Sequence, residues 1–257
     1  MSIVTVGRHI VHYEALGHGR PVVLVHGWLG TWRYWWPTMQ VLSATHRTYA
    51  MDLWGFGQTS KVESNYSFEA MVTLVEAFVE KLGIVPPYSL VGHGAGGAVA
   101  LWVAQRQPEK VASLSLIAMP TNGRQIDVDS VSDSVADPES GTLLHFPEVG
   151  REVAKCDPAA ARALARELSG FNFSYELERC RCPILFVAGQ QDVLVRPDDE
   201  ATYRTRDNHH RVMLADSGHF PMLDQPMTFN RLLLDFLLYG GGEAEIAPKE
   251  YWQRRTR

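Results

Sequence analysis

Cysteine is scarce in this chain, with three residues among 257. Three cysteines cannot all pair, and they show no regular spacing, which favours free thiols over the disulfide framework of a secreted domain. The one close pair, Cys180 and Cys182, offers too few ligands for a metal site. We therefore expect free thiols, no bound metal and a reducing compartment, by default the cytoplasm.

Long apolar runs are also missing. No stretch of the sequence stays apolar over the roughly 20 residues that a helix needs to cross a bilayer. The first residues, 1–6, lack the charged and then apolar pattern of a signal peptide. We expect no membrane insertion.

The chain has no excess of positive charge, because its formal net charge is −5. This balance gives no reason to expect nucleic acid or an anionic membrane surface as a partner. A glycine-rich phosphate-binding loop with its lysine is absent, so we expect no nucleotide, flavin or other cofactor. Hydrophobic residues (46%) and charged residues (21%) lie close to the averages of globular proteins, which excludes a disordered chain.

Short apolar runs alternate with segments of helical periodicity along most of the sequence. The predicted strands include residues 22–25, 49–52, 88–91, 111–117 and 183–187, and the predicted helices include 68–82, 98–104 and 158–168. Alternating strands and helices indicate βαβ units. The expected fold class is therefore α/β, with a mostly parallel central sheet covered by helices on both faces.

The alternation stops after Pro120. Residues 121–140 are rich in Asp, Ser and Val without clear periodicity, whereas Asp157 and Pro158 are suited to cap and begin a helix that runs to Leu168. We predict a core formed by residues 1–120 and 181–257, and a small lid formed by residues 121–180. Such a lid would cover the carboxyl edge of the sheet, where open α/β sheets place their sites.

Four short motifs occur along the chain in a fixed order. They are His26-Gly27-Trp28, Gly92-His93-Gly94-Ala95-Gly96-Gly97, Gly189-Gln190-Gln191-Asp192 and Gly218-His219. Together and in this order they resemble the motifs of the α/β-hydrolase family, and the resemblance covers nearly the whole chain apart from the predicted lid. The nucleophile elbow of that family reads Gly-x-Ser-x-Gly, and in this chain the serine position is Gly94.

The resemblance implies a role for each motif. Asp192 is the acid and His219 the base of a catalytic triad, and the backbone amides of Trp28 and Ala95 form the oxyanion hole. Histidine suits a base because it titrates near neutral pH, and a carboxylate behind it fixes its tautomer. Backbone donors survive any change of side chain at position 94.

Gly94 changes both the chemistry and the backbone energetics of the predicted elbow. Glycine has no side chain, so the covalent nucleophile of the family is absent. The elbow nucleophile sits on a strained turn, which costs a non-glycine residue of order 1–3 kcal/mol. Glycine adopts a positive φ almost freely, so we expect Gly94 to relieve that strain.

Several neighbouring residues have simpler structural interpretations. Trp28 belongs to an aromatic cluster with Trp32, Tyr34, Trp35 and Trp36 that we expect to serve mainly packing, with Trp28 the best candidate to line an apolar substrate pocket.

The remaining polar candidates near the elbow also favour structural roles. We expect Asp52, with Gly55 and Gly57, to form a structural turn. His93 should pack beside the elbow and point away from the reaction centre. The acidic residues between 127 and 137 are expected to form a solvated surface of the lid.

Three functions stay open at the level of sequence. The first is an ester or acyl hydrolase scaffold that is weak or inactive because Gly94 replaces the nucleophile. The second is a non-catalytic protein that binds a small molecule, and the third is an enzyme that uses the histidine and aspartate without a covalent intermediate. In each case the expected ligand is a small apolar or acyl-containing molecule.

Overall fold

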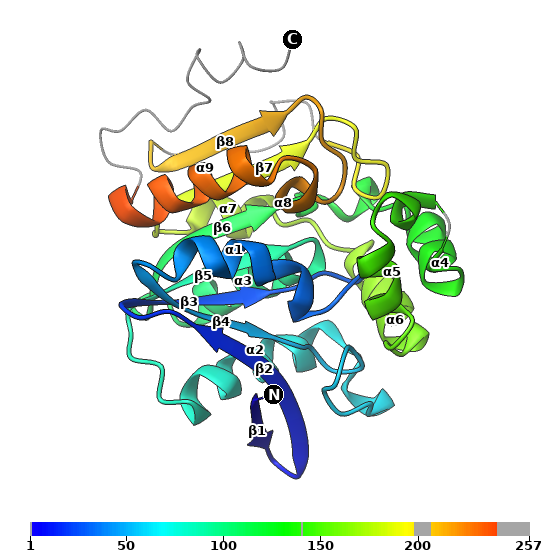
Figure 1. Ribbon diagram of the computed structural model, residues 1–257, viewed down its shortest axis with the longest axis horizontal. Helices are drawn as coiled ribbons and strands as arrows, with labels where there is room; N and C mark the ends of the chain where they lie inside the picture. Colours follow the sequence, from blue (N-terminus) through cyan, green and yellow to red (C-terminus); the bar gives the residue numbers. More distant parts are fainter. Residues whose placement is uncertain (1, 140, 198–206, 241–257) are drawn as a thin grey trace.

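The computed structural model describes residues 2–139, 141–197 and 207–240, so the predicted core residues 198–206 and 241–257 lie outside the described residues (Figure 1). Within this part, eight strands form one sheet in the order β1-β2-β4-β3-β5-β6-β7-β8. Their bounds are β1 Ser2–Val6, β2 His9–Leu16, β3 Arg20–Val25, β4 His46–Met51, β5 Tyr88–His93, β6 Val111–Ile117, β7 Ile184–Gly189 and β8 His209–Leu214. Only the pairings of β1 with β2 and of β2 with β4 are antiparallel; the remaining pairings are parallel.

The parallel strands form where the sequence is continuously apolar. Val22 to Val25 of β3 are fully buried, and all six residues of β7 are buried. A strand covered on both faces needs apolar residues at every position, in contrast to the alternation of a half-exposed strand. The predicted mostly parallel sheet is confirmed.

Helices cover both faces of the sheet, as predicted (Figure 1). One face carries α2 (Phe68–Lys81) and α3 (Ala95–Arg106), which pack against each other, and the other carries α1 (Trp36–Leu42) and α9 (Pro226–Tyr239). The short helix α8 (Pro221–Asp224) precedes α9, and 3-10 turns include η1 (Trp32–Trp35), η2 (Glu63–Asn65), η3 (Gly123–Gln125) and η4 (Gly141–His145).

Among the described residues between β6 and β7 there are four α-helices: α4 (Val128–Ala136), α5 (Pro147–Val153), α6 (Pro158–Leu168) and α7 (Ser174–Arg179). Helix α6 has the predicted bounds, and the Asp157 side chain accepts a hydrogen bond from the Ala159 amide at its N-terminus. In Figure 1, α4, α5 and α6 gather at the end of the sheet toward which the parallel strands point, while α7 packs on α3.

Helix α4 is a difference from the sequence analysis, which found no periodicity in residues 121–140. Asp127 caps it by accepting from the Ser130 amide, and Val131 and Val135 are buried one turn apart. The hydroxyls of Ser132 and Ser134 donate to carbonyls one turn earlier. Ser, Asp and Val are indifferent helix formers, so the packing of α4 against α6 stabilises this helix more than its composition does.

Asp157 allows a test of how α6 is anchored. Its second carboxylate oxygen accepts a hydrogen bond from the Tyr66 hydroxyl at 2.8 Å. Asp157→Ala removes both the cap and this bond, so we expect urea denaturation to give a free energy of unfolding about 1–2 kcal/mol lower. Tyr66→Phe removes only the second bond and should cost less; equal losses in the two variants would contradict a capping role.

Candidate active site

Gly94 connects the end of β5 to the start of α3 by a sharp turn. Its dihedral angles are φ 51° and ψ −120°, a conformation that side chains with a Cβ rarely adopt. Two residues later, α3 passes so close to β3 that a Cβ on Gly96 would overlap the carbonyl groups of Val25 and His26. A strand, a sharp turn with positive φ and a helix follow one another here, as expected for an elbow with glycine at position 94.

Asp192 and His219, which are 27 residues apart, form a buried pair. Asp192 lies beyond the end of β7 and His219 beyond the end of β8, and these two strands are parallel neighbours. The Nδ1 atom of His219 lies 2.8 Å from Oδ2 of Asp192. The other carboxylate oxygen accepts from the amides of Leu194 and Val195, both at 2.9 Å. These bonds hold the carboxylate as an acceptor, so the Nδ1–H of His219 donates to it, and in the neutral tautomer of the ring Nε2 is left as an acceptor.

The free nitrogen of His219 faces position 94. A Cβ placed on Gly94 would lie 3.5 Å from Nε2 and 3.7 Å from Cε1 of His219, both ordinary contacts. The Nε2 atom is buried and has no hydrogen-bond partner among the described residues. A buried polar atom without a partner is uncommon in folded proteins, and this one lies at the elbow.

Two backbone amides lie at the same loops. Trp28 follows the end of β3 by three residues, and Ala95 is the first residue of α3, whose amide has no acceptor within the helix. Within the described ranges, neither the Trp28 nor the Ala95 amide takes part in a backbone hydrogen bond outside helices and strands. The indole of Trp28 stacks almost parallel to His219, with ring centroids 6.1 Å apart.

A cavity of about 650 Å³ reaches His219. Its lining comprises Ser130, Asp133, Ser134, Gly141, His145, Phe146, Gln191, Val193, Gly218, His219 and Asp224. Trp28 is absent from this lining and is only 1% exposed. Its predicted contact with a substrate therefore stays a prediction.

His93 and Tyr34 brace the site from behind, and sequence analysis assigned neither of them that role. The Nε2–H of His93 donates to the His219 carbonyl at 2.7 Å. The Tyr34 hydroxyl donates to Nδ1 of His93 at 2.9 Å. The same hydroxyl accepts a hydrogen bond from the Gly27 amide at 2.8 Å. The rings of His93 and His219 lie 4.5 Å apart. His93 packs beside the elbow, as predicted, and its bonds to the His219 carbonyl and the Tyr34 hydroxyl are what the sequence did not reveal.

Burial lowers the pKa of His93 well below its ordinary value of 6.5, and the neighbouring His219 lowers it further. Burial also raises the pKa of Tyr34 well above its ordinary value. Both groups therefore stay neutral around pH 7, which the chain of hydrogen bonds from Gly27 to His219 requires.

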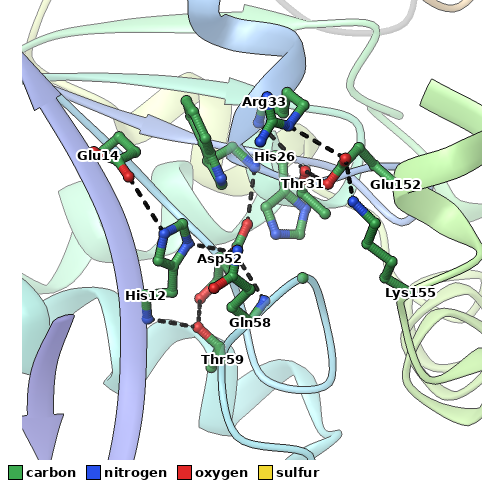
Figure 2. A network of polar contacts seen from close by, with 12 residues as sticks. His12, Glu14, His26, Thr31, Arg33, Asp52, Gln58, Thr59, Glu152 and Lys155 are labelled. Atoms are coloured by element: carbon green, nitrogen blue, oxygen red, sulfur yellow. Dashed lines mark hydrogen bonds and ion pairs between the residues drawn. The ribbon is translucent and has the colours of Figure 1, made fainter. Parts of the chain in front are cut away.

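Asp52 organises the loop that follows Trp28, as Figure 2 shows. Its buried carboxylate accepts from the Trp32 amide (2.9 Å) and the Gln58 amide (3.1 Å) and contacts Nδ1 of His12 at 2.8 Å. The Thr59 hydroxyl donates to the Asp52 carbonyl. All these partners are structural, which agrees with the interpretation of Asp52 as part of a turn.

Glu152 links helix α5 to the same loop (Figure 2). Its carboxylate lies 3.2 Å from Nε of Arg33 and 2.6 Å from Nζ of Lys155, and it accepts a longer bond of 3.4 Å from the Thr31 hydroxyl. The helices between β6 and β7 are thereby joined to the segment that carries Trp28.

The described residues contain no group of three His, Cys, Asp or Glu side chains placed to hold a metal ion. A search of the same residues finds no helix with the length and apolar character needed to cross a membrane.

Comparisons with known proteins agree with the observed fold. Residues 20–137 match the family described as the alpha/beta hydrolase fold. The chain is 30% identical to the dihydrolipoyllysine-residue acetyltransferase component of the acetoin cleaving system of Pseudomonas putida, over 90% of this chain and 68% of that protein. The chain belongs to the α/β-hydrolase fold family.

Other relatives carry the names of hydrolases. The chain is 25% identical to the 2-hydroxy-6-oxo-6-(2'-aminophenyl)hexa-2,4-dienoic acid hydrolase of Metapseudomonas resinovorans, over 91% of this chain and 89% of that protein. It is 26% identical to a pimeloyl-[acyl-carrier protein] methyl ester esterase of Neisseria meningitidis, over 85% of this chain and 93% of that protein. A solved thermophilic esterase from Thermogutta terrifontis shares the fold, with a TM-score of 0.79 and 23% identity over 94% of this chain and 100% of that one.

The backbone at Gly94 predicts the stability of a serine variant. Gly94→Ser introduces a Cβ at a residue with φ 51°, where it makes no close contact. We therefore expect backbone strain alone to lower the free energy of unfolding, by about 1–3 kcal/mol. We expect thermal denaturation to show a lower Tm, with the same loss in Gly94→Ala, which carries the Cβ but no hydroxyl. A Tm raised by serine would contradict the strained turn.

His93 predicts an acid-sensitive stability. Between the lowered pKa of the folded state and about 6.5, the unfolded chain binds a proton that the folded chain refuses, so stability falls as the pH drops below about 6.5. His93→Gln keeps a donor toward the His219 carbonyl and does not titrate, so its urea midpoint should change less between pH 7 and pH 5. If the urea midpoint of the unaltered protein and that of His93→Gln fall equally between pH 7 and pH 5, His93 does not contribute to the acid sensitivity.

Proposed function

We propose that this protein is an acyl hydrolase scaffold in which Asp192 and His219 activate a water molecule, while Gly94 leaves no covalent nucleophile. One observation carries the proposal: the buried, unpartnered Nε2 atom of His219 faces the empty position 94. A non-catalytic binding protein has no need of a base held in this way.

The proposed steps use the groups in their observed arrangement. Neutral His219 takes a proton from water through Nε2, and Asp192 stabilises the imidazolium that forms. The water oxygen attacks the acyl carbon, and the amides of Trp28 and Ala95 donate to the developing oxyanion. His219 then returns the proton to the leaving group.

The rate should be low. Removing a member of a serine triad leaves a residual acceleration of roughly 10³–10⁴ over water, which comes from the oxyanion hole and substrate binding. Water also has to be held in place by a single acceptor, without the positional advantage of an attached hydroxyl.

We extend the proposal to residues 121–180 as a lid over a core formed by residues 1–120 and 181–257. Phe146, which precedes α5, packs on Phe220 with ring centroids 5.4 Å apart, directly beside His219. His145 and Phe146 share the lining of the 650 Å³ cavity with His219. This placement supports a small acyl-containing substrate held between the lid and the core, in keeping with the esterase and hydrolase names of the relatives.

A panel of chromogenic acyl esters tests this function on the chain and on Gly94→Ser in parallel. Loss of a triad serine can cost about 10⁶ in kcat, so we expect serine to raise kcat/KM by at least about 10²-fold. Gly94→Ala is the matched control, because it adds the same Cβ without a hydroxyl, and it should gain nothing. No turnover in either the chain or the serine variant would contradict the proposal.

The same buried Nε2 atom also favours a second candidate, an enzyme in which His219 abstracts a proton without any acyl transfer. That function predicts an activity which His219→Gln abolishes and Gly94→Ser does not raise. Tight binding of a small molecule that depends on neither His219 nor Asp192 would indicate a binding protein instead.

A further inference from the structure

A second cavity, of about 1150 Å³, lies beside the one that reaches His219. Most of its lining comes from two segments: residues 30–37, which include η1, and residues 145–155, which include α5. The linings of the two cavities have His145 and Phe146 in common. The cavities are therefore neighbours, and these two residues lie at their boundary.

Phe146 is packed against the core at this boundary. It is half-buried, and its ring lies 5.4 Å from that of the fully buried Phe220, measured between centroids. The ring of Phe220 in turn lies 5.3 Å from that of His219. His145, by contrast, is exposed. The Phe146 ring is therefore the side chain that separates the space at His219 from the second cavity.

The second cavity suits a neutral, apolar group. Trp32, Tyr34 and Trp36 line it, and aromatic side chains offer large apolar contact areas. Its charged residues are equal in number, with the carboxylates Glu14, Glu148 and Glu152 and the cations Arg33, Arg151 and Lys155. Because these charges cancel, the cavity as a whole attracts neither a cation nor an anion.

The walls of the second cavity are tied to each other. The carboxylate of Glu152 on α5 lies 3.2 Å from Nε of Arg33 and accepts a bond of 3.4 Å from the Thr31 hydroxyl. These contacts join the segment 145–155 to the segment 30–37, as Figure 2 shows. The cavity is thus held open between two linked walls, and Phe146 stands where it meets the space at His219.

We propose that the two cavities form one binding site for the acyl group of an ester, and that Phe146 determines how long an apolar acyl chain the site accepts. A short chain stays in the cavity that reaches His219. A longer chain has to pass the Phe146 ring to reach the aromatic residues of the second cavity. This inference rests on the proposed function, since it assigns the acyl part of the proposed substrate to these cavities.

The expected effect of removing the ring follows from the burial of methylene groups. Each methylene that leaves water favours binding by a factor of about four, which corresponds to about 0.8 kcal/mol. Phe146→Ala joins the two cavities, so the far end of a long chain gains contacts there. A chain that is too short to reach the boundary gains none.

The first test measures binding to the full chain with two neutral amides, octanamide and butanamide, which carry a long and a short acyl group. Ligand-observed proton NMR gives the Kd of each amide for the unaltered protein and for Phe146→Ala. We expect Phe146→Ala to lower the Kd of octanamide at least about tenfold, the effect of two or more newly buried methylenes. The Kd of butanamide should stay the same.

Leu144→Ala is the matched control, because Leu144 lies two residues earlier, is 64% exposed and lines neither cavity. It should change neither Kd. Phe146→Trp keeps a ring at the boundary and should gain no affinity for octanamide. Thermal melts show whether each variant is folded. If Phe146→Ala does not fold, Phe146→Leu keeps an apolar contact with Phe220 and should show part of the gain.

The second test measures turnover in the Gly94→Ser variant. We expect Phe146→Ala to raise the ratio of kcat/KM for p-nitrophenyl octanoate over p-nitrophenyl butyrate at least about tenfold, for the same reason as in binding. Leu144→Ala should leave this ratio unchanged.

Equal gains for octanamide and butanamide in Phe146→Ala, the same gain in Leu144→Ala, or no gain in either Phe146→Ala or Phe146→Leu would each overturn the role of Phe146. If Gly94→Ser hydrolyses both esters and Phe146→Ala leaves their ratio unchanged, the proposed function stands and only this inference fails. If octanamide binds as expected while no form of the protein turns over any ester, the proposed function fails and Phe146 still sets the length of chain that the cavities bind.

Discussion

The hydrogen bond from His93 to the carbonyl of His219 holds the candidate site together. It spans 126 residues of sequence and joins the end of β5 to the loop after β8, two segments that belong to different strands of the sheet. Tyr34 extends the same chain of bonds to Gly27, beside the amide of Trp28. The elbow, the histidine loop and the Trp28 loop therefore keep one relative position, and burial keeps His93 in the neutral form that this bonding requires.

A serine at position 94 would supply both the backbone turn of an elbow and a nucleophilic hydroxyl, whereas glycine supplies only the turn. The turn keeps a φ of 51°, so the backbone geometry of a nucleophile elbow survives although no nucleophile is there to use it. A residue without a Cβ holds this conformation almost free of strain. What remains is a histidine with one unpartnered nitrogen, which faces the point where a serine side chain would begin.

Sequence patterns predicted the central strands, helices α2, α3 and α6, and the four motif loops, because each rests on a local signal such as an apolar run, a cap or a glycine turn. Helix α4 escaped prediction because its Ser and Val residues have little intrinsic preference, and its contacts with α6 decide its conformation. The hydrogen-bond partners of His93 escaped prediction for a related reason. Its neighbours Tyr34 and His219 are distant in sequence, and no local pattern reports them.

The sequence by itself determined the α/β class, the order of the motifs and the absence of a side chain at position 94, since these follow from residue identity and short-range periodicity. The tertiary structure decided that Nδ1 of His219 meets Asp192, that Nε2 stays without a partner and that this atom faces Gly94. These are distances between loops at the carboxyl ends of different strands. Only the packing of the whole sheet with its helices sets such distances, because no single segment of the chain contains both partners.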